Sequence, residues 1–549
     1  MTKLKIFNGI VVDPLNNIQG EVKDILIEDG KIVEKFSSQE DVKEIDAAHK
    51  TVVPAALDIH THIASQQATW ARLLGNQNDL FKKAWKFFTL EEISKSYISN
   101  GYTTVLEANV YPSLVKETVF DFKHLPLLDK AFLLNVSNLW PLESEFQKKR
   151  FEDAAVFISD LLQKTKGFGL KAYNPFEAEE WNFKELRENI EQKGKLYNFS
   201  AMDVYETLIK ANEYLKLPHA VHTHIEGYET EVGNQNLNRL LEIVKSMNSS
   251  KTSNRTSIFH LAHASSYFPD GNISSFLELI NNTDKIDLDL GFLTFNEINP
   301  VISSDRRFIN TVLQNNIPPS EYKILRSAME FEGDFFVSLR KFEKGNKSHS
   351  IYWLNALNLA LNIKDKWKVQ LTLNYPNYGN IKDIPQIATW LLSKHARNEF
   401  ANSLSLDDGL FEPETEPLSF YDFIIISRAS PAKSIGLSQI KGHLGAGADG
   451  DVNILDLNIN ETDLSNDPEK VYKSFKELDH VIKEGNIVKK GDQVDLSQKG
   501  KILWSEGSID KSTKVMFLNR KAEFYKKYYS IFYDSLNVSI EPGLLRKID

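Results

Sequence analysis

Histidines cluster in three short apolar segments of this 549-residue chain, and the clusters carry its clearest chemical signal. Residues two apart on a strand point to the same face, so His60 and His62 in DIHTH can aim both imidazoles at one point. Adjacent imidazoles are costly to bury unless a cation or hydrogen bonds compensate them. The spacing predicts a metal-binding pair, and the segments PHAVHTH and FHLAH add the candidate ligands His222, His224 and His263.

Lys171 lies in the apolar segment FGLKAYNP, where a charged ammonium would be buried at considerable cost. Two interpretations of this lysine stay open. Either it pairs with a nearby carboxylate, or its amine has reacted with carbon dioxide to give a carbamate that bridges two metal ions. Neutral imidazoles and a carboxylate-like bridge suit Zn²⁺, which needs no thiolate.

The composition narrows the possible chemistry. The chain has no cysteine, which excludes thiolate zinc sites, iron–sulfur clusters, cysteine nucleophiles and disulfides. Its formal net charge of −10 gives no indication of a nucleic-acid or membrane surface. The opening MTKLKIFNGIVVDP is too short and strand-like for a signal peptide, and no apolar run approaches the roughly 18 residues of a spanning helix. We therefore expect a cytoplasmic location.

Strand and helix patterns alternate along the middle of the chain. Amphipathic helical patterns such as LEEISKSYISN and FEDAAVFISDLLQK separate most of the strands. Eight strands in one direction predict a (β/α)8 barrel, whose chemistry gathers at the C-terminal strand ends, although an open doubly wound sheet is an alternative. The eight candidate strands are TVVPAALDIH, YTTVLEANV, AFLLNVSN, FGLKAYNP, HAVHTHIE, SIFHLAHAS, KIDLDLGFLTF and VQLTLNYP.

The two ends of the chain share a different sequence pattern, that of short strands. Short strands in the first 50 residues are broken at Asn8-Gly9 and at the hairpin-forming Asp29-Gly30, and similar strands return in DVNILDLN and LDHVIKEGNIVK. We therefore predict a β-sandwich built from residues 1–53 and 411–549 around a barrel at 54–410. The segment SLDDGLFEPETEPLS is expected to be a loop that closes the barrel region.

Several stretches together resemble the amidohydrolase superfamily. Within it they most resemble the group that contains the A subunit of formylmethanofuran dehydrogenase and the hydrolase (alpha) subunit of bacterial formyltransferase/hydrolase complexes. The resemblance spans nearly the whole chain, and LKAYNPFEAEEW and NIKDKWKVQLTLNYPN are its more specific parts. It rests on PAALDIHTHIAS, GYTTVLEANV, LKAYNPFEAEEW, LPHAVHTH, IDLDLGFLTF, WLNALNLALNIKDKWKVQLTLNYPN and RASPAKSIGL…GHLGAGADGDVNIL.

The resemblance implies roles for individual residues. It places a mono- or binuclear metal centre, expected to be two zinc ions, on His60, His62, His263 and a carboxylated Lys171. On the fifth strand, His222 and His224 both fit the ligand position, and both are kept as candidate ligands. His260 is expected to lie behind the metal ligands, because it faces away from His263 on a regular strand.

The eighth strand departs from the family pattern. Where the family reads threonine, aspartate, histidine, proline, this chain reads Leu373, Asn374, Tyr375 and Pro376. Asn374 therefore stands at the position of the aspartate that binds metal and shuttles a proton, and an amide cannot take up a proton at neutral pH. Glu226 and Asp289 are the nearby acids that could replace it, although a structural role is expected of each.

Two main hypotheses for function follow. In the first, the protein hydrolyses the N-formyl group of a methanofuran- or methylofuran-type carrier and releases formate, working beside a formyltransferase and other subunits. In the second, it is a catalytically weakened subunit that binds the carrier and serves as a scaffold. Hydrolysis of another cyclic amide or formamide is a third possibility with weaker segment matches. Neither nucleic acid nor a membrane is expected as a partner.

Overall fold

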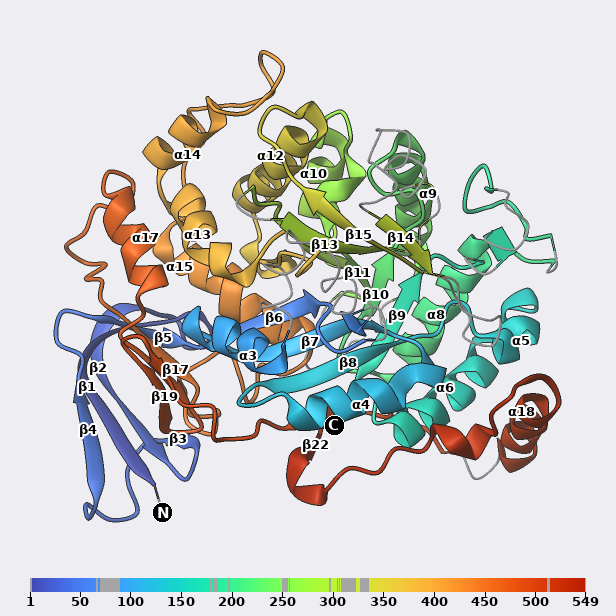
Figure 1. The fold of residues 1–549 in the computed structure, drawn as a ribbon, viewed down its shortest axis with the longest axis horizontal. Helices are drawn as coiled ribbons and strands as arrows, with labels where there is room; N and C mark the ends of the chain where they lie inside the picture. Colours follow the sequence, from blue (N-terminus) through green and yellow to red (C-terminus); the bar gives the residue numbers. More distant parts are fainter. Residues whose placement is uncertain are drawn as a thin grey trace.

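The structure of the chain is a computed structural model, and its sheets and surrounding helices are drawn in Figure 1. It describes residues 2–65, 68–69, 89–176, 179–180, 186–195, 198–248, 255, 257–295, 298–303, 305, 307, 322–325, 335–510 and 514–548.

Eight parallel strands form a nearly closed barrel. This confirms the predicted (β/α)8 barrel, and the alternative of an open doubly wound sheet is wrong. Each predicted strand segment supplies one of them in chain order. The last gap is bridged where Thr61 pairs with Tyr375 and the His62 amide donates to the Tyr375 carbonyl at 2.7 Å. The barrel strands are β6 (Ala56–Thr61), β7 (Tyr102–Val110), β8 (Asp129–Asn135), β9 (Gly169–Tyr173), β10 (Val221–His224), β11 (Phe259–Leu261), β12 (Ile286–Asp289) and β16 (Val369–Gln370).

Helices surround the barrel and bury their apolar faces against it (Figure 1). Their starts follow capping chemistry: Ser200 and Asp203 form a capping box, and Thr89 accepts from the Glu92 amide. Within the described part of the chain, no helix is long and apolar enough to cross a membrane. The main helices are α3 (Leu90–Ser99), α4 (Val115–His124), α6 (Phe151–Thr165), α8 (Ala201–Leu215), α9 (Glu231–Ser246), α10 (Ser274–Asn281), α12 (Lys347–Asn362), α13 (Ile384–Leu392), α14 (Lys394–Ala401) and α17 (Pro468–Lys476).

The two ends of the chain meet in one nine-stranded mixed sheet, where β5 pairs antiparallel with β17. Asp29-Gly30 forms the predicted hairpin turn, with positive φ at both residues. The expected break at Asn8-Gly9 is wrong, because this dipeptide is a bulge within a continuous strand. The sheet contains β1 (Lys3–Asp13), β2 (Ile18–Glu28), β3 (Lys31–Val33), β4 (Val42–Asp46), β5 (Thr51–Pro54), β17 (Val452–Leu455), β18 (His480–Lys483), β19 (Asn486–Lys490) and β20 (Gln493–Val494).

Two further parts of the fold have no counterpart in the sequence prediction. Strands β21 (Ile502–Trp504) and β22 (Leu545–Lys547) extend the barrel sheet beyond β8 and are not part of the terminal sheet. Helix α18 (Val515–Tyr528) lies between them in sequence. A three-stranded antiparallel sheet is inserted between β12 and α12. It comprises β13 (Ile298–Ser303), β14 (Tyr322–Leu325) and β15 (Phe335–Lys341).

A buried charge cluster joins the terminal sheet to the barrel. Lys441 Nζ lies 2.7 to 2.9 Å from carboxylate oxygens of Asp129, Asp449 and Asp451, and Lys483 pairs with Asp129 at 2.7 Å. The three carboxylates could hold a metal ion, but the Lys441 ammonium already lies among them. Burial opposes the charged carboxyls, yet the two lysines hold the pKa of Asp129 well below its usual range.

We expect Lys441→Met to destabilise the protein by about 3–5 kcal/mol, because it leaves buried carboxylates without their shared cation. Denaturant unfolding measures the loss, with Lys95→Met on the exposed face of α3 as the control. Since the pKa of Asp129 is lowered in the folded state, the stability it contributes is present at neutral pH. That contribution is lost as the pH falls below about 4. Equal stability of both variants at neutral pH would contradict this assignment.

Candidate metal centre

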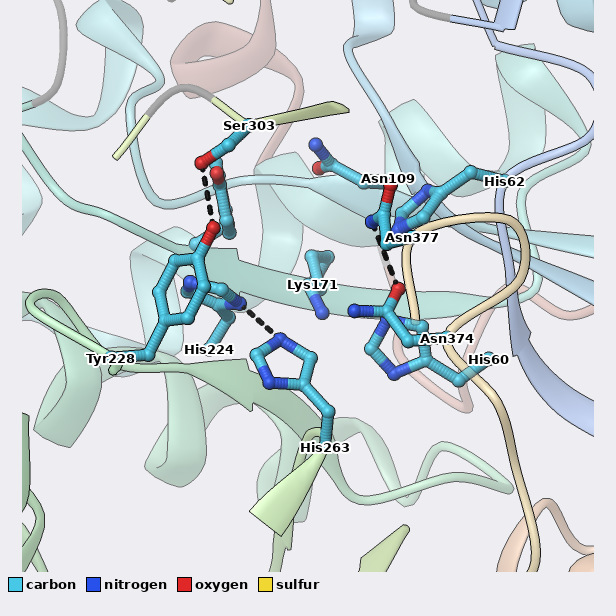
Figure 2. A pocket seen from close by; sticks show the side chains of 11 residues that line it. His60, His62, Asn109, Lys171, His224, Tyr228, His263, Ser303, Asn374 and Asn377 are labelled. Atoms are coloured by element: carbon cyan, nitrogen blue, oxygen red, sulfur yellow. Dashed lines mark hydrogen bonds between the residues drawn. The ribbon is translucent and has the colours of Figure 1, made fainter. Parts of the chain in front are cut away.

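A pocket lies at the C-terminal ends of the barrel strands and collects chemically active side chains from six of them (Figure 2). Ser303 of the inserted sheet also reaches it. The carboxyl ends of parallel barrel strands meet on one face, which brings residues distant in sequence together. The lining residues are His60, His62, Asn109, Lys171, Tyr173, His224, Tyr228, His263, Ser303, Asn374 and Asn377.

A buried carboxylate contacts each histidine of the first strand. Asp289 Oδ2 lies 3.0 Å from His60 Nδ1, and Glu107 Oε1 lies 3.1 Å from His62 Nδ1. Glu107 also accepts from the backbone amides of Ile63 and Ala64 at 2.7 and 2.9 Å, which fixes the chain just after His62. With Nδ1 engaged, each imidazole has its Nε2 available to the pocket, the arrangement of a metal-ligating histidine backed by a carboxylate.

His224 and His263 converge on a second point of the pocket. His263 Nε2 lies 2.7 Å from His224 Nδ1, and His263 Nδ1 lies 2.8 Å from Ser266 Oγ. Burial lowers the pKa of both histidines well below the usual value, so both are neutral at pH 7. The close approach of His263 depends on Gly291, where a Cβ atom would collide with the His263 side chain. Two neutral imidazoles at this distance share a hydrogen bond, and the same two nitrogens could instead bind one divalent ion.

His222 lies behind the pocket wall. Its Nε2 is 3.1 Å from His60 Nδ1, and its Nδ1 is 3.1 Å from His219 Nε2. The structure thus brings His224, and not His222, into the pocket. His260 is also outside it, bonded to Asp287 at 2.9 Å and Asp289 at 3.1 Å. Although burial disfavours its charged form, these carboxylates raise the pKa of His260 to about 9.

Lys171 points into the pocket from β9, among the histidines (Figure 2). Burial lowers the pKa of its amine to about 7, despite attraction from Asp289 and Glu107. Among the described residues, no carboxylate lies within ion-pair distance of Lys171 Nζ, so the ion-pair interpretation finds no partner there. A large share of this amine is therefore uncharged near pH 7, the form that reacts with carbon dioxide.

Asn374 lies in the pocket, where its Oδ1 accepts from Asn377 Nδ2 at 3.1 Å. Among the described residues that line the pocket, none is an aspartate or glutamate. Glu226 is held elsewhere by Arg187 at 2.7 Å and by the Tyr205 hydroxyl at 2.9 Å. The expectation that Glu226 is structural agrees with these contacts.

Asp289 is likewise held by hydrogen bonds to both of its carboxylate oxygens. Besides His60 and His260, it accepts from the Thr372 hydroxyl at 2.6 Å and the His263 amide at 3.0 Å. The pKa of Asp289 lies well below its usual range: burial raises it, but His60 and His260 lower it further. Asp289 thus contacts the candidate ligands His60 and His263 from behind and is not among the residues that line the pocket.

Glu107 and Tyr228 are not among the residues predicted from the sequence. Glu107 is the acidic residue of the apolar strand YTTVLEANV, and a lone acid in a buried strand is a usable signal. Tyr228 packs against His224, and its hydroxyl lies 2.8 Å from Ser303 Oγ. Nothing in the sequence pattern places this tyrosine against the pocket.

The sequence is similar to known proteins over most of its length. Residues 348–489 match the family model described as Amidohydrolase family. The chain is 27% identical over 559 residues to protein FwdA of Methanocaldococcus jannaschii, covering 98% of this chain and 96% of the relative. It is 27% identical over 480 residues to the A subunit of the formyltransferase/hydrolase complex Fhc of Methylorubrum extorquens, covering 82% of this chain and 83% of the relative.

The fold matches a chain in the crystal structure of the formyltransferase/hydrolase complex FhcABCD from Methylorubrum extorquens in complex with methylofuran. The TM-score is 0.85 at 22% identity, with 100% of this chain and 99% of that chain covered. The barrel and the terminal sheet form an amidohydrolase fold, and the sequence is similar to proteins of the amidohydrolase superfamily. The chain is a homologue of FwdA over nearly its full length and of the Fhc A subunit over most of it.

Proposed function

We propose that this protein is a metal-dependent hydrolase that releases formate from the N-formyl group of a furfurylamine-type one-carbon carrier. The observation that supports it is the pocket in which His60, His62, Lys171, His224 and His263 converge from four different strands. These residues would hold one or two zinc ions, with a Lys171 carbamate as the bridge. A bound divalent metal supplies Lewis acidity, which activates water and polarises the formyl carbonyl.

The substrate and partners of this proposal come from the relatives. The Methylorubrum extorquens complex is a formyltransferase/hydrolase and was crystallised with methylofuran, so a formylated carrier of that type is the first substrate to test. We propose that this chain likewise works as one subunit beside a formyltransferase, which supplies or receives the formyl group on the carrier.

Formate release from N-formylfurfurylamine and from formylated methylofuran, measured on zinc-reconstituted protein, tests the proposal. We expect hydrolysis of the formyl compounds and none of N-acetylfurfurylamine or dihydroorotate. Hydrolysis of dihydroorotate in preference to the formyl compounds would contradict the substrate class. Reconstituted protein that binds no zinc would contradict the metal-dependent reaction itself.

A second candidate function is a carrier-binding scaffold with weak or no turnover. The observation that favours it is Asn374, because no carboxylate is found among the described residues lining the pocket. The departing amine needs a proton, and an asparagine amide cannot relay one at neutral pH. In this case the protein binds carrier and metal but releases formate far more slowly than its relatives.

Lys171 is expected to be a carbamate when metal occupies the pocket, because a positive lysine beside bound cations would add repulsion to its burial cost. Zinc-loaded protein equilibrated with ¹³C-bicarbonate should give a carbamate carbonyl signal, and electron density should extend beyond Nζ as a planar group. Lys171→Met, of similar length, should lose that signal and bind less zinc. A free ammonium in a zinc-loaded crystal would contradict the prediction.

A further inference from the structure

A row of buried imidazoles runs from the candidate metal centre into the barrel. His60 Nδ1 lies 3.1 Å from His222 Nε2, and His222 Nδ1 lies 3.1 Å from His219 Nε2. The row ends where His219 Nδ1 lies 2.9 Å from the backbone carbonyl oxygen of Ser434. All three histidines are almost completely buried, at 0–1% exposed. The row is therefore enclosed by protein.

The carbonyl at the end of the row determines where each proton sits. A carbonyl oxygen only accepts, so His219 must donate from Nδ1, and its Nε2 is left as an acceptor. His222 then donates from Nδ1 to His219 and presents an unprotonated Nε2 to His60. His60 in turn carries its proton on Nδ1, which it shares between His222 Nε2 and Asp289 Oδ2.

One consequence concerns the pocket directly. A neutral imidazole has one proton, so a His60 protonated on Nδ1 has its lone pair on Nε2. That lone pair is the one available to a metal ion in the pocket. A neutral imidazole in solution exchanges between two tautomers, whereas here two acceptors on the Nδ1 side select one of them.

The same three groups could instead be taken for a buried metal site. His60 Nδ1, His222 Nε2 and Asp289 Oδ2 lie 3.0 to 3.6 Å apart. Asp289 already accepts from Thr372 and contacts His260, and His60 would have to lose both protons to ligate ions on both nitrogens. Hydrogen bonding satisfies every atom of the triangle without an ion.

We propose that His222 and His219 are positioning residues that hold His60 in the tautomer competent to bind metal. The inference rests on the proposed metal centre and assigns a role to histidines that do not line it. His222 thereby acts through His60 and is not itself a ligand.

The zinc affinity of purified full-length variants, measured by competition with a chromogenic chelator, tests this role. His222→Leu should weaken zinc binding by about 10- to 100-fold, the usual cost of losing a group that orients a metal ligand. His222→Gln should recover most of the affinity, because its amide oxygen can accept from His60 while its NH₂ donates to His219. His349→Leu, which removes a buried histidine of α12 outside the pocket, should leave the affinity unchanged.

The possible outcomes separate this inference from the proposed function. Wild-type protein that binds no zinc contradicts the metal centre itself. Tight binding by both the wild type and His222→Leu overturns the positioning role alone, as does a Gln variant no better than Leu. An ion located between His60, His222 and Asp289 by anomalous scattering at the zinc edge would also overturn it. If His222→Leu does not fold, His219→Leu tests the positioning role instead, and we expect it to bind zinc more weakly than the wild type.

Discussion

In the double variant His60→Ala/His62→Ala, the zinc content is expected to fall to the background level, and formate release is expected to stop. Both side chains enter the pocket from the end of one strand, and each is oriented by its own carboxylate. Their removal takes away both imidazole ligands on one side of the proposed centre, which the remaining pair cannot replace. Elemental analysis of protein prepared without chelators, together with formate release, measures the result.

The matched control replaces two exposed histidines, His124 and His395, with alanine. This variant should keep its zinc and its activity. Circular dichroism and the unfolding temperature establish that both variants remain folded. Unchanged zinc content in the His60/His62 variant would place the metal elsewhere in the chain and remove the support for a metal-dependent hydrolase.

Asn374→Asp is expected to raise the rate of formate release by about 10²- to 10⁴-fold, the usual contribution of a positioned general acid/base. Asn374 lies in the pocket, so a carboxylate at the same position would lie beside the candidate metal ligands. It would add an anionic metal ligand where the natural protein has a neutral amide, and a group able to carry a proton to the departing amine. Steady-state kinetics and zinc content at pH 7 measure both effects.

Asn377→Asp is the matched control, because it adds the same charge to the neighbouring pocket residue that donates to Asn374. A gain confined to Asn374→Asp supports the weakened-subunit hypothesis for the natural protein. A natural protein that already turns over at the rate of its relatives, with no gain from the aspartate, would show that another group carries the proton. In that event the scaffold hypothesis fails.

The charges around the pocket would favour a bound cation. Four histidines line it, and the carboxylates of Glu107 and Asp289 lie one layer behind His62 and His60. A pocket of this kind favours a cation without placing a carboxylate against the substrate. In the proposed reaction, the asparagine at position 374 would therefore affect proton transfer more than the initial binding of metal.

The barrel and its set of candidate ligands could be predicted from the sequence because their determinants are local. Apolar segments that end in His-x-His specify both a strand and the face on which two imidazoles lie. Parallel strands in a barrel end on one face, so order along the chain suffices to bring His60, Lys171 and His263 together. The position of Asn374 in the pocket follows from the same rule.

The choice between His222 and His224 required the tertiary structure. Both side chains point inward from β10, and alternation along a strand does not report depth along the barrel axis. The pairing of His222 with Lys171 places this histidine one layer deeper, while the long lysine side chain still reaches the pocket. Register between strands is a non-local property, set by packing around the whole barrel.

Local sequence patterns were enough to predict the strands, the helices between them and the residue types directed at one end of the barrel, since each depends on neighbours in the chain. Long-range packing places Asp289 and Glu107 behind the candidate ligands His60 and His62, and it joins β21 and β22 to the barrel sheet. It also decided that Glu226 faces Arg187 instead of the pocket. These contacts join residues tens to hundreds of positions apart, and such pairings follow from burial and packing that no local pattern encodes.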